Sequence, residues 1–507
     1  MKNYALRKCV VVGVLSMVSM PVLAQDPCTP KAQKLARKAY ELYEHNQMSK
    51  SATLFKRSAG MGCPTAQFNT GWFYLTGTGV RQDYVEAVTW FRRAAEKGDD
   101  DGMFHLGMCY YYGYGVPKSY SAAVRFLSQA AALDHPEAQY LLGQCYERGE
   151  GVDRDVEEAT DLYRRAAFGG VNDANMSAAR CYDQYLDRPE EAFRFLMRAA
   201  VGGNDSAKCQ VAYCYEQGRG VELNLDSAIV WYGRDGESAL SQRRMGGCLL
   251  RQGRADEALT WIMKAAEKED PEAQRMMGNC KMTGQGCDTN LNEAILWYKK
   301  AAEGGDVESQ YHLGEVFDHL GGARATKETA VDWYRQAAMN NHAEAQCDLG
   351  ICYENGEGVK KDYAEAVRWY RLSADQGNAR AFYCLGNCYY NGRGVERSRK
   401  DAIRWWTNAA QLGQVDAQIN LSYCYEHGEG VTRSLTLAFN WCEKAANQGN
   451  AAAQYALGLF YEYGKGRDIS ISDAFMWYGK AAEQGHAAAQ KKYEELAPKM
   501  EVTPETE

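Results

Sequence analysis

A segment of about 36 residues recurs along most of this chain, and this repeat constrains the fold more than any other feature. The clearest copy spans residues 342–377, HAEAQCDLGICYENGEGVKKDYAEAVRWYRLSADQG. Ala345 and Leu349 begin an apolar stripe with helical spacing, and the Gly-Glu-Gly run that follows predicts the end of that helix. Asp362 then stands where the N-cap of a second helix belongs. One such hairpin leaves an apolar face uncovered, so the copies are expected to stack on one another.

The register can be followed through twelve units. The spacing is 36 residues, except for steps of 33, 34 and 32 between Cys181 and Cys280. A glycine inside the first helix, such as Gly350, is expected to let the neighbouring helix approach closely. Ten of the twelve second helices are expected to begin after a side chain that accepts a hydrogen bond from the helix N-terminus, while Arg188 and Arg254 precede the other two. These N-caps are Asp83, Ser119, Asp155, Asn224, Asn290, Thr326, Asp362, Ser398, Ser434 and Ser470.

These patterns predict an all-α fold, an α/α solenoid of about twelve helical hairpins over residues 63–485. Residues 25–62 predict a looser hairpin without the glycine loop, which would cap the N-terminal end of the array. Residues 486–507 predict one more first helix, ending at Ala497, as a C-terminal cap that is followed by a charged tail from Pro498.

Residues 1–24 have the composition of a signal peptide rather than of a folded element. Three basic residues come before or at the start of an apolar run from Cys9 to Met20, and small residues precede a cleavage point after Ala24. The sequence therefore predicts an exported protein, periplasmic or extracellular, with an uncleaved anchor as the alternative. The apolar run is too short to span a bilayer and no later stretch is long enough, so no membrane span is expected.

The repeat resembles a known family. The pattern A-x-x-x-LG-x-x-Y-x-x-G-x-GV followed by A-x-x-W-Y-x-x-AA-x-x-G is similar to the Sel1-like repeat, a relative of the tetratricopeptide repeat. The resemblance implies a right-handed superhelix whose first helices line a concave face, and a role as an adaptor in protein complexes. Units 171–203 and 237–269 depart from the pattern through Ala179 in place of glycine and through shortened loops, and unit 204–236 lacks the Ala-Ala pair. Uniform curvature is therefore not expected across these units.

Sixteen cysteines follow Cys9, so the chain is cysteine-rich. Nine of them occupy the core position of successive first helices, where small buried hydrophobic side chains are expected. Two other pairs are candidates for disulfides: Cys28 with Cys63, which both precede first helices of adjacent hairpins, and Cys347 with Cys384. Cysteine-rich relatives close one disulfide inside each repeat, but here only Cys442 lies in a second helix, so that scheme does not transfer.

No motif indicates catalysis, a metal or a cofactor. The strings S-x-x-K, K-T-G, G-x-S-x-G and H-E-x-x-H are absent, and no cysteine pair has zinc-site spacing. His135, His342 and His486 open repeats at equivalent places, which favours a role at a helix N-terminus over metal ligation. We therefore expect no enzyme activity, although the resemblance keeps open a cell-wall or β-lactam-binding protein with weak hydrolase activity.

The resemblance places two sets of residues on the concave face: those four residues after the glycine of each first helix, which are mostly acidic, and tyrosines three residues before that glycine. A net charge of −8 argues against nucleic acid as the partner. A tyrosine-lined acidic groove would suit a protein or peptide partner, and a basic partner would complement its charge. We expect the protein to be a monomer. The alternatives are that the glutamates only solvate the surface, or that the protein is a structural envelope component. The candidate partner-binding residues are Tyr111, Tyr140, Glu147, Glu216, Tyr311, Asp318, Glu354, Tyr383, Tyr390, Glu426, Tyr455 and Glu462.

Overall fold

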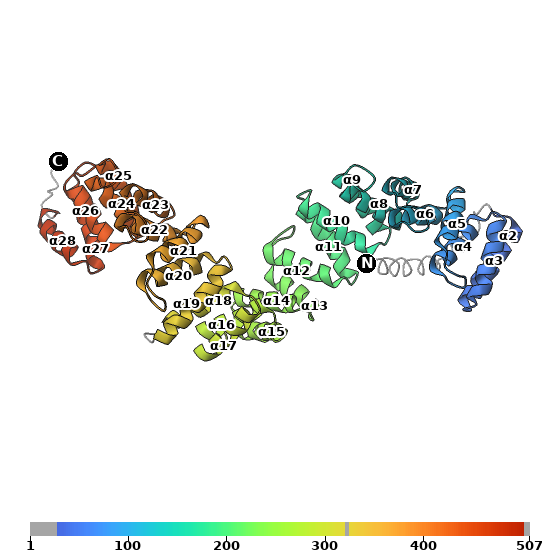
Figure 1. The fold of residues 1–507 in the computed structure, drawn as a ribbon, viewed down its shortest axis with the longest axis horizontal. Coiled ribbons are helices and arrows are strands. Elements are labelled where there is room, and N and C mark those ends of the chain that lie inside the picture. Colours follow the sequence, from blue (N-terminus) through green and yellow to red (C-terminus); the bar gives the residue numbers. More distant parts are fainter. Residues whose placement is uncertain (1–27, 320–323, 501–507) are drawn as a thin grey trace, which may run out of the picture. The chain divides into compact units, whose positions relative to one another are not determined.

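The computed structural model describes residues 28–319 and 324–500, and these residues form 27 helices and no strand. The expected signal peptide, residues 1–24, lies outside the described residues. The chain divides into two compact units, residues 1–252 and 253–507. In each unit successive helices pair as hairpins that stack along the chain (Figure 1). The all-α solenoid predicted from the repeat is confirmed.

The first unit contains an N-terminal hairpin, five complete repeats and the first helix of a sixth. From α2 to α14, successive helices of this unit pack against one another. The helices are α2 (Pro30–Glu44), α3 (Met48–Gly60), α4 (Pro64–Thr76), α5 (Tyr84–Ala95), α6 (Asp100–Tyr112), α7 (Tyr120–Ala132), α8 (Pro136–Arg148), α9 (Val156–Phe168), α10 (Asn172–Gln184), α11 (Pro189–Val201), α12 (Asp205–Gln217), α13 (Leu225–Arg234) and α14 (Ala239–Arg251).

The second unit continues the array and ends on one unpaired helix, which packs against α27. Its helices are α15 (Ala255–Glu267), α16 (Pro271–Thr283), α17 (Leu291–Glu303), α18 (Val307–His319), α19 (Arg324–Met339), α20 (Ala343–Asn355), α21 (Tyr363–Asp375), α22 (Ala379–Asn391), α23 (Arg399–Gln411), α24 (Val415–His427), α25 (Leu435–Asn447), α26 (Ala451–Glu462), α27 (Ile471–Glu483) and α28 (Ala487–Met500).

The predicted N-caps explain where most second helices begin. Asp362 accepts hydrogen bonds from the backbone N–H groups of Ala364 and Glu365, and equivalent side-chain caps begin eight further second helices. Arg188 and Arg254 make no such bond, as expected. The predicted cap at Thr326 is wrong, because α19 already begins at Arg324 and Thr326 lies within its first turn.

In most hairpins a glycine on the first helix makes close packing against the second helix possible. A Cβ atom added at Gly350 would lie 2.6 Å from the ring of Tyr370 on the second helix and 3.2 Å from the carbonyl oxygen of Ala366. The glycines at the same position of other repeats face an aromatic ring or a leucine in the same way. The predicted role of this glycine is confirmed.

The glycine loop also joins neighbouring repeats. Gly356 ends α20 with φ +81°, and Gly358 has φ +67°. A Cβ atom added at Gly358 would lie 2.2 Å from the carbonyl oxygen of Lys327, near the start of α19 in the preceding repeat. The loop therefore needs its second glycine because another backbone lies against it.

The ends of the array differ in how they are secured. At the N-terminal end a disulfide joins Cys28, just before α2, to Cys63 at the N-cap of α4. At the C-terminal end α28 continues to Met500 and includes Pro498, three residues beyond the expected end at Ala497. A proline this close to a helix end removes only one backbone hydrogen bond, so the last turn still forms.

Candidate functional site

The acidic row predicted to line a groove is bonded within the repeats. The phenolic oxygen of Tyr370 on α21 donates to Glu354 Oε2 on α20 over 2.8 Å. Three other hairpins repeat this bond at distances of 2.6–2.7 Å. Where the first helix carries Glu426 at this position, the second helix carries Cys442 in place of tyrosine. The three equivalent pairs are Tyr163–Glu147, Tyr232–Glu216 and Tyr478–Glu462.

A cation from the next repeat reaches each of these carboxylates. Arg393 Nη1 lies 3.1 Å from Glu354 Oε1, and it comes from the position between the two loop glycines of the following repeat. Lys465 occupies the same loop position and lies 2.6 Å from Glu426. Most of the acidic charge on this row is therefore neutralised by neighbouring repeats. The other pairs between repeats are Arg180–Glu147, Arg244–Glu216 and Lys492–Glu462, while Asp318 pairs with Lys327 of its own hairpin.

In two repeats the carboxylate lies in the loop of the next repeat instead of on the first helix. The first helix carries Tyr111 or Tyr390 instead of an acid, and the next loop carries Glu150 or Glu429 between its glycines. The tyrosine hydroxyl then donates to the loop glutamate, at 2.6 and 2.7 Å. Burial and this bond together raise the pKa of Tyr111. The row is thus a ladder of complementary contacts between repeats.

The remaining predicted tyrosines are half-buried against their neighbours. Tyr311 stacks on His342 with ring centroids 4.6 Å apart, and Tyr455 stacks on His486 at 4.7 Å. Tyr140 lies beside the buried Tyr163, at 5.6 Å. Tyr383 is half-buried against the core formed by α23 and α24. No member of the predicted set is fully exposed.

The stacked histidines take the role expected at a helix start. Nδ1 of His342 accepts a hydrogen bond from the backbone N–H of Ala345, which caps α20. His135 and His486 make the same bond with the third residue after each of them. Among the described residues no group of three or more His, Cys, Asp or Glu side chains is arranged to hold a metal ion. No helix in the described ranges combines the length and apolar character needed to cross a membrane.

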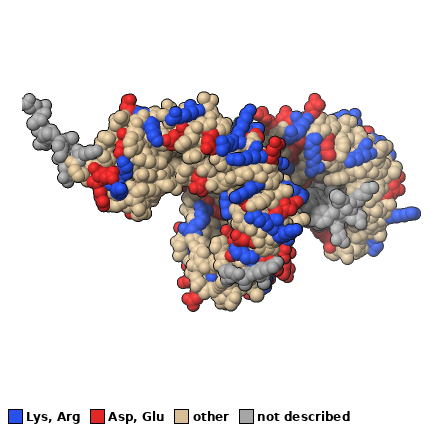
Figure 2. Space-filling view, turned by 60° about the vertical axis from the view of Figure 1, so that its left-hand side comes forward, with Lys and Arg blue, Asp and Glu red and all other residues tan. Residues whose placement is uncertain are grey.

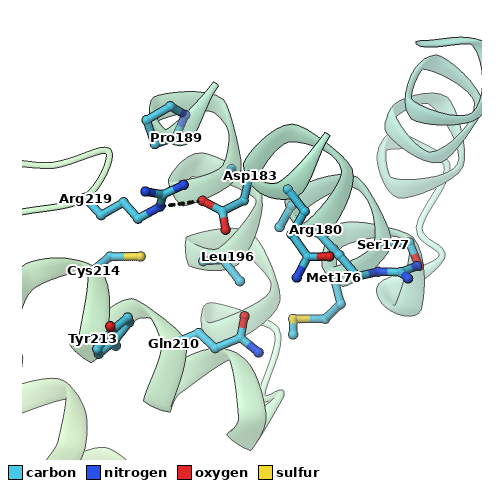
Figure 3. Close-up of a pocket in the computed structure, with 13 residues that line it drawn as sticks. Met176, Ser177, Arg180, Asp183, Pro189, Leu196, Gln210, Tyr213, Cys214 and Arg219 are labelled. Atoms are coloured by element: carbon cyan, nitrogen blue, oxygen red, sulfur yellow. Dashed lines mark hydrogen bonds and ion pairs between the residues drawn. The ribbon is translucent and has the colours of Figure 1, made fainter. Parts of the chain in front are cut away.

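An open pocket in the first unit is the clearest candidate site, and it lies where the repeat is irregular (Figure 3). It encloses about 500 Å³ between α10, α11 and α12. In Figure 3 Arg219 and Asp183 approach each other on one side, and Gln210 and Tyr213 lie on the other. The residues used below define this α10–α12 pocket: Arg180, Asp183, Gln184, Gln210, Tyr213 and Arg219.

Two departures from the repeat create the pocket. Leu196 on α11 occupies the position of Tyr163 and Tyr232 in the neighbouring second helices, so no phenol fills the space above it. The loop between α10 and α11 is also shorter than the glycine loop of regular repeats, and the unit spacing falls to 33 residues. The volume that a tyrosine and a longer loop take up elsewhere is therefore open here.

Charged side chains at the pocket are held by ion pairs. Arg219 Nε lies 2.7 Å from Asp183 Oδ1, the regular contact between repeats, and Arg180 Nη2 lies 3.0 Å from Glu147 Oε2. The guanidinium of Arg244 lies 4.6 Å from the ring centre of Tyr213, as a cation–π contact. Gln184 and Gln210 are exposed beside these anchored groups. The surface thus offers amide donors and acceptors, an aromatic ring and two guanidinium groups.

The prediction from sequence included none of the pocket residues among its candidate sites. The sequence marks unit 171–203 as irregular, but that irregularity predicts a change of curvature and not an opening. The signal that could have found it is Leu196 combined with the shortened loop, since in most other repeats a tyrosine or tryptophan at that position covers its own first helix. Over the face in Figure 2, basic and acidic side chains are interspersed, so charge alone does not mark a site.

The repeats show which known family this chain is similar to. The Sel1 repeat model matches ten segments of the chain. The chain belongs to the Sel1 repeat family. The matched segments leave out the hairpin α10–α11, which lines the pocket, and the residues of α14 and α15. The segments are 64–99, 100–135, 136–169, 205–234, 271–306, 307–342, 343–378, 381–414, 415–450 and 451–486.

Two solved structures are similar to this Sel1 repeat chain. One is a protective antigen present in uropathogenic Escherichia coli strains that displays an SLR fold; it is 30% identical, with a TM-score of 0.56, and the match covers 88% of this chain and 90% of that one. The other is a Sel1 repeat protein from Oxalobacter formigenes, 31% identical with a TM-score of 0.43, covering 47% of this chain and 96% of that one. No curated protein sequence matches this chain.

Proposed function

We propose that this Sel1 repeat protein is an exported interaction scaffold that holds an extended segment of a partner protein in the α10–α12 pocket. Sel1 repeat proteins are generally protein-interaction scaffolds, and this chain has the repeats and the solenoid. The observation that carries the proposal is the pocket itself, which opens between α10, α11 and α12 at the irregular hairpin. No catalytic role is proposed for it.

The chemistry of the pocket suits a polypeptide main chain. An extended peptide presents N–H and C=O groups that need partners, and the amides of Gln184 and Gln210 can both donate and accept. Tyr213 offers a large apolar surface beside them at small entropic cost. The ion pairs of Arg180 and Arg219 fix these side chains at the edges of the pocket, so less freedom is lost when a peptide binds.

In this proposal the acidic residues that suggested a basic partner hold repeats together rather than bind the partner. Glu147, Glu216, Glu354 and Glu462 each accept a tyrosine hydrogen bond and face a cation of the next repeat. Their charge is therefore largely compensated before any partner arrives. We expect the pocket to select peptides by main-chain bonding and one bulky side chain rather than by a basic charge.

Export is supported by the disulfide between Cys28 and Cys63. Disulfides persist in oxidising compartments such as the periplasm and the extracellular space, and are rare in the cytosol. The composition of residues 1–24 points the same way. A fusion of residues 1–30 to a reporter enzyme that is active only outside the cytoplasm tests this part, and a silent reporter would contradict it.

The binding proposal is tested with a displayed library of random peptides selected on the full-length protein. The affinity of an enriched peptide is then measured by fluorescence anisotropy for the wild type and for Tyr213→Ala. Removal of a central aromatic contact is expected to weaken binding by about tenfold or more. Failure to enrich any peptide, or unchanged affinity in the variant, would overturn the proposal.

Tyr423→Ala is the matched control. Tyr423 stands at the same position of its repeat as Tyr213 and has a similar exposure, 48% against 41%, but it lies in the second unit. The pocket does not include it. The control is therefore expected to bind the selected peptide as the wild type does.

A further inference from the structure

The structure brings two cysteine side chains of the second unit together. Cys347 on α20 is 1% exposed in a core that α20 shares with α21 and α22. Cys384 on α22 is half-buried and packs against that same core. The two thiols are within hydrogen-bonding range of each other, and each is reduced in this structure.

The register of the repeat explains why this pair meets when other cysteines do not. Cys347 lies three residues before Gly350, whereas Cys384 lies two residues before Gly386. This offset of one residue turns one side chain toward the other across neighbouring first helices. Cysteines that share one register position, such as Cys352 and Cys388, are instead kept apart by the spacing of packed helices.

The surroundings of the pair provide a charge and access to solvent. Arg380 precedes Cys384 by one helical turn on α22, and its guanidinium lies 2.6 Å from Asp348 Oδ1. The side chain of Arg380 is 55% exposed, and Cys384 is itself half-buried whereas Cys347 is buried. The pKa of the Cys347 thiol is raised, first by the hydrogen bond with Cys384 and then by burial. Cys384 is thus the accessible member of the pair and Cys347 the protected one.

We propose that Cys347 and Cys384 are a redox site, a dithiol that forms a reversible disulfide between α20 and α22 and so staples two neighbouring repeats. The oxidant is a small or protein disulfide, such as oxidised glutathione or the disulfide of a thiol oxidase. This site is separate from the α10–α12 pocket and does not rest on the proposed peptide binding.

The reaction is two steps of thiol–disulfide exchange. The Cys384 thiolate attacks one sulfur of the oxidant, which breaks the oxidant disulfide and releases one thiolate. Cys347 then loses its proton and attacks Cys384 Sγ, which releases the second thiolate of the oxidant. The two protons of the cysteine thiols end on the two released thiolates, so two thiols are oxidised and one disulfide is reduced.

Redox titration of the purified full-length protein tests the site. The protein is equilibrated at defined ratios of oxidised to reduced glutathione, quenched in acid, alkylated after denaturation and digested without reduction. We expect a loss of two alkylated thiols in one transition and a peptide pair that contains Cys347 and Cys384. Urea unfolding of the wild type in the two redox states is expected to show a higher midpoint for the oxidised form.

Two variants distinguish oxidation of the Cys347–Cys384 pair from oxidation of other thiols in the chain. Cys384→Ser is expected to abolish the two-thiol transition, while Cys209→Ser keeps it, because Cys209 has the register position of Cys347 but lies on α12 in the first unit. A linked Cys280–Cys287 peptide with Cys347 still alkylated would overturn the proposal. So would a stable glutathione adduct on Cys384, or no transition at any ratio.

Discussion

The hydroxyl of Tyr370 donates a 2.8 Å hydrogen bond to Glu354 across the two helices of one hairpin, and Arg393 of the next repeat lies 3.1 Å from the other carboxylate oxygen. Tyr370 is fully buried. The glutamate therefore joins the core of its own repeat to the loop of the next one. This relationship assigns the recurrent acidic position to packing between repeats.

Tyr370→Phe is expected to destabilise the second unit by about 1–2 kcal/mol, because Glu354 loses a buried donor while the ring still packs. Urea unfolding monitored by circular dichroism measures the change. Glu396→Lys is the control, since Glu396 is exposed and a surface substitution of this kind changes stability by less than about 0.5 kcal/mol. Equal stability of Tyr370→Phe and the wild type would contradict the structural role of the bond.

Gly350→Ala is expected to lower stability by about 1–3 kcal/mol, because the added methyl group would lie 2.6 Å from the Tyr370 ring. Gly233→Ala provides the opposite case. Gly233 lies in α13 with no atom within 4 Å of an added Cβ, so alanine should stabilise the helix by about 0.5–1 kcal/mol. Thermal unfolding of both variants checks this difference in sign, and a gain for both would contradict it.

The first unit is expected to lose stability in acid through His105. Burial lowers the pKa of His105 from 6.5 to about 4, and the side chain packs among the rings of Phe68, Phe91 and Phe104. Above pH 6.5 the histidine is neutral in both states, and below it only the unfolded chain takes up the proton. Its contribution therefore falls as pH drops from 6.5 to about 4, by a total on the order of 3 kcal/mol.

The measurement compares urea unfolding of the wild type and His105→Phe at several pH values. Phenylalanine suits the same aromatic surroundings and cannot take up a proton, so the variant should lack this part of the acid loss. His135 acts in the opposite sense, because Asp101 raises its pKa against the lowering effect of burial. Above pH 6.5 the free energies of unfolding of the wild type and the variant should differ by a constant amount, and below it the difference should change with pH. Parallel curves down to pH 4 would refute the assignment.

Native-state alkylation is expected to divide the thiols into two classes. Burial raises the pKa of Cys145 and Cys352 to about 12, so both are protonated and shielded at pH 8. Cys209, Cys287 and Cys384 are half-buried and should react first. Mass spectrometry after brief treatment with iodoacetamide checks the order, and rapid labelling of Cys145 would contradict it.

Much of the fold was predictable because the same pattern recurs in twelve units of the sequence. Helix starts at Asp362 and its equivalents, the glycine at Gly350 and the core position of Cys352 follow from spacing and from local chemistry alone. The helix boundary near Thr326 was not predictable, because a cap residue placed inside a helix looks the same in sequence as one before it.

The candidate site was harder to predict, since a recurrent polar residue can serve either packing or binding. The family resemblance places Glu354 and Tyr390 in a groove. Their partners Tyr370 and Glu429 lie 16 and 39 residues away in the sequence, which is too far for a local pattern to reveal. The pocket arises from what unit 171–203 lacks, a tyrosine at the position of Leu196 together with a full-length loop. An absence is visible only once the neighbouring side chains are placed.

The most direct test of this account measures peptide affinity and unfolding midpoint together for Tyr213→Ala and Glu354→Gln. Tyr213 is 41% exposed at the pocket, whereas Glu354 bonds to Tyr370 and Arg393. We predict that Tyr213→Ala weakens the selected peptide by about tenfold without moving the midpoint. Glu354→Gln should lower the midpoint and leave the affinity unchanged. The reverse pattern, with binding lost at Glu354 and kept at Tyr213, would contradict the account.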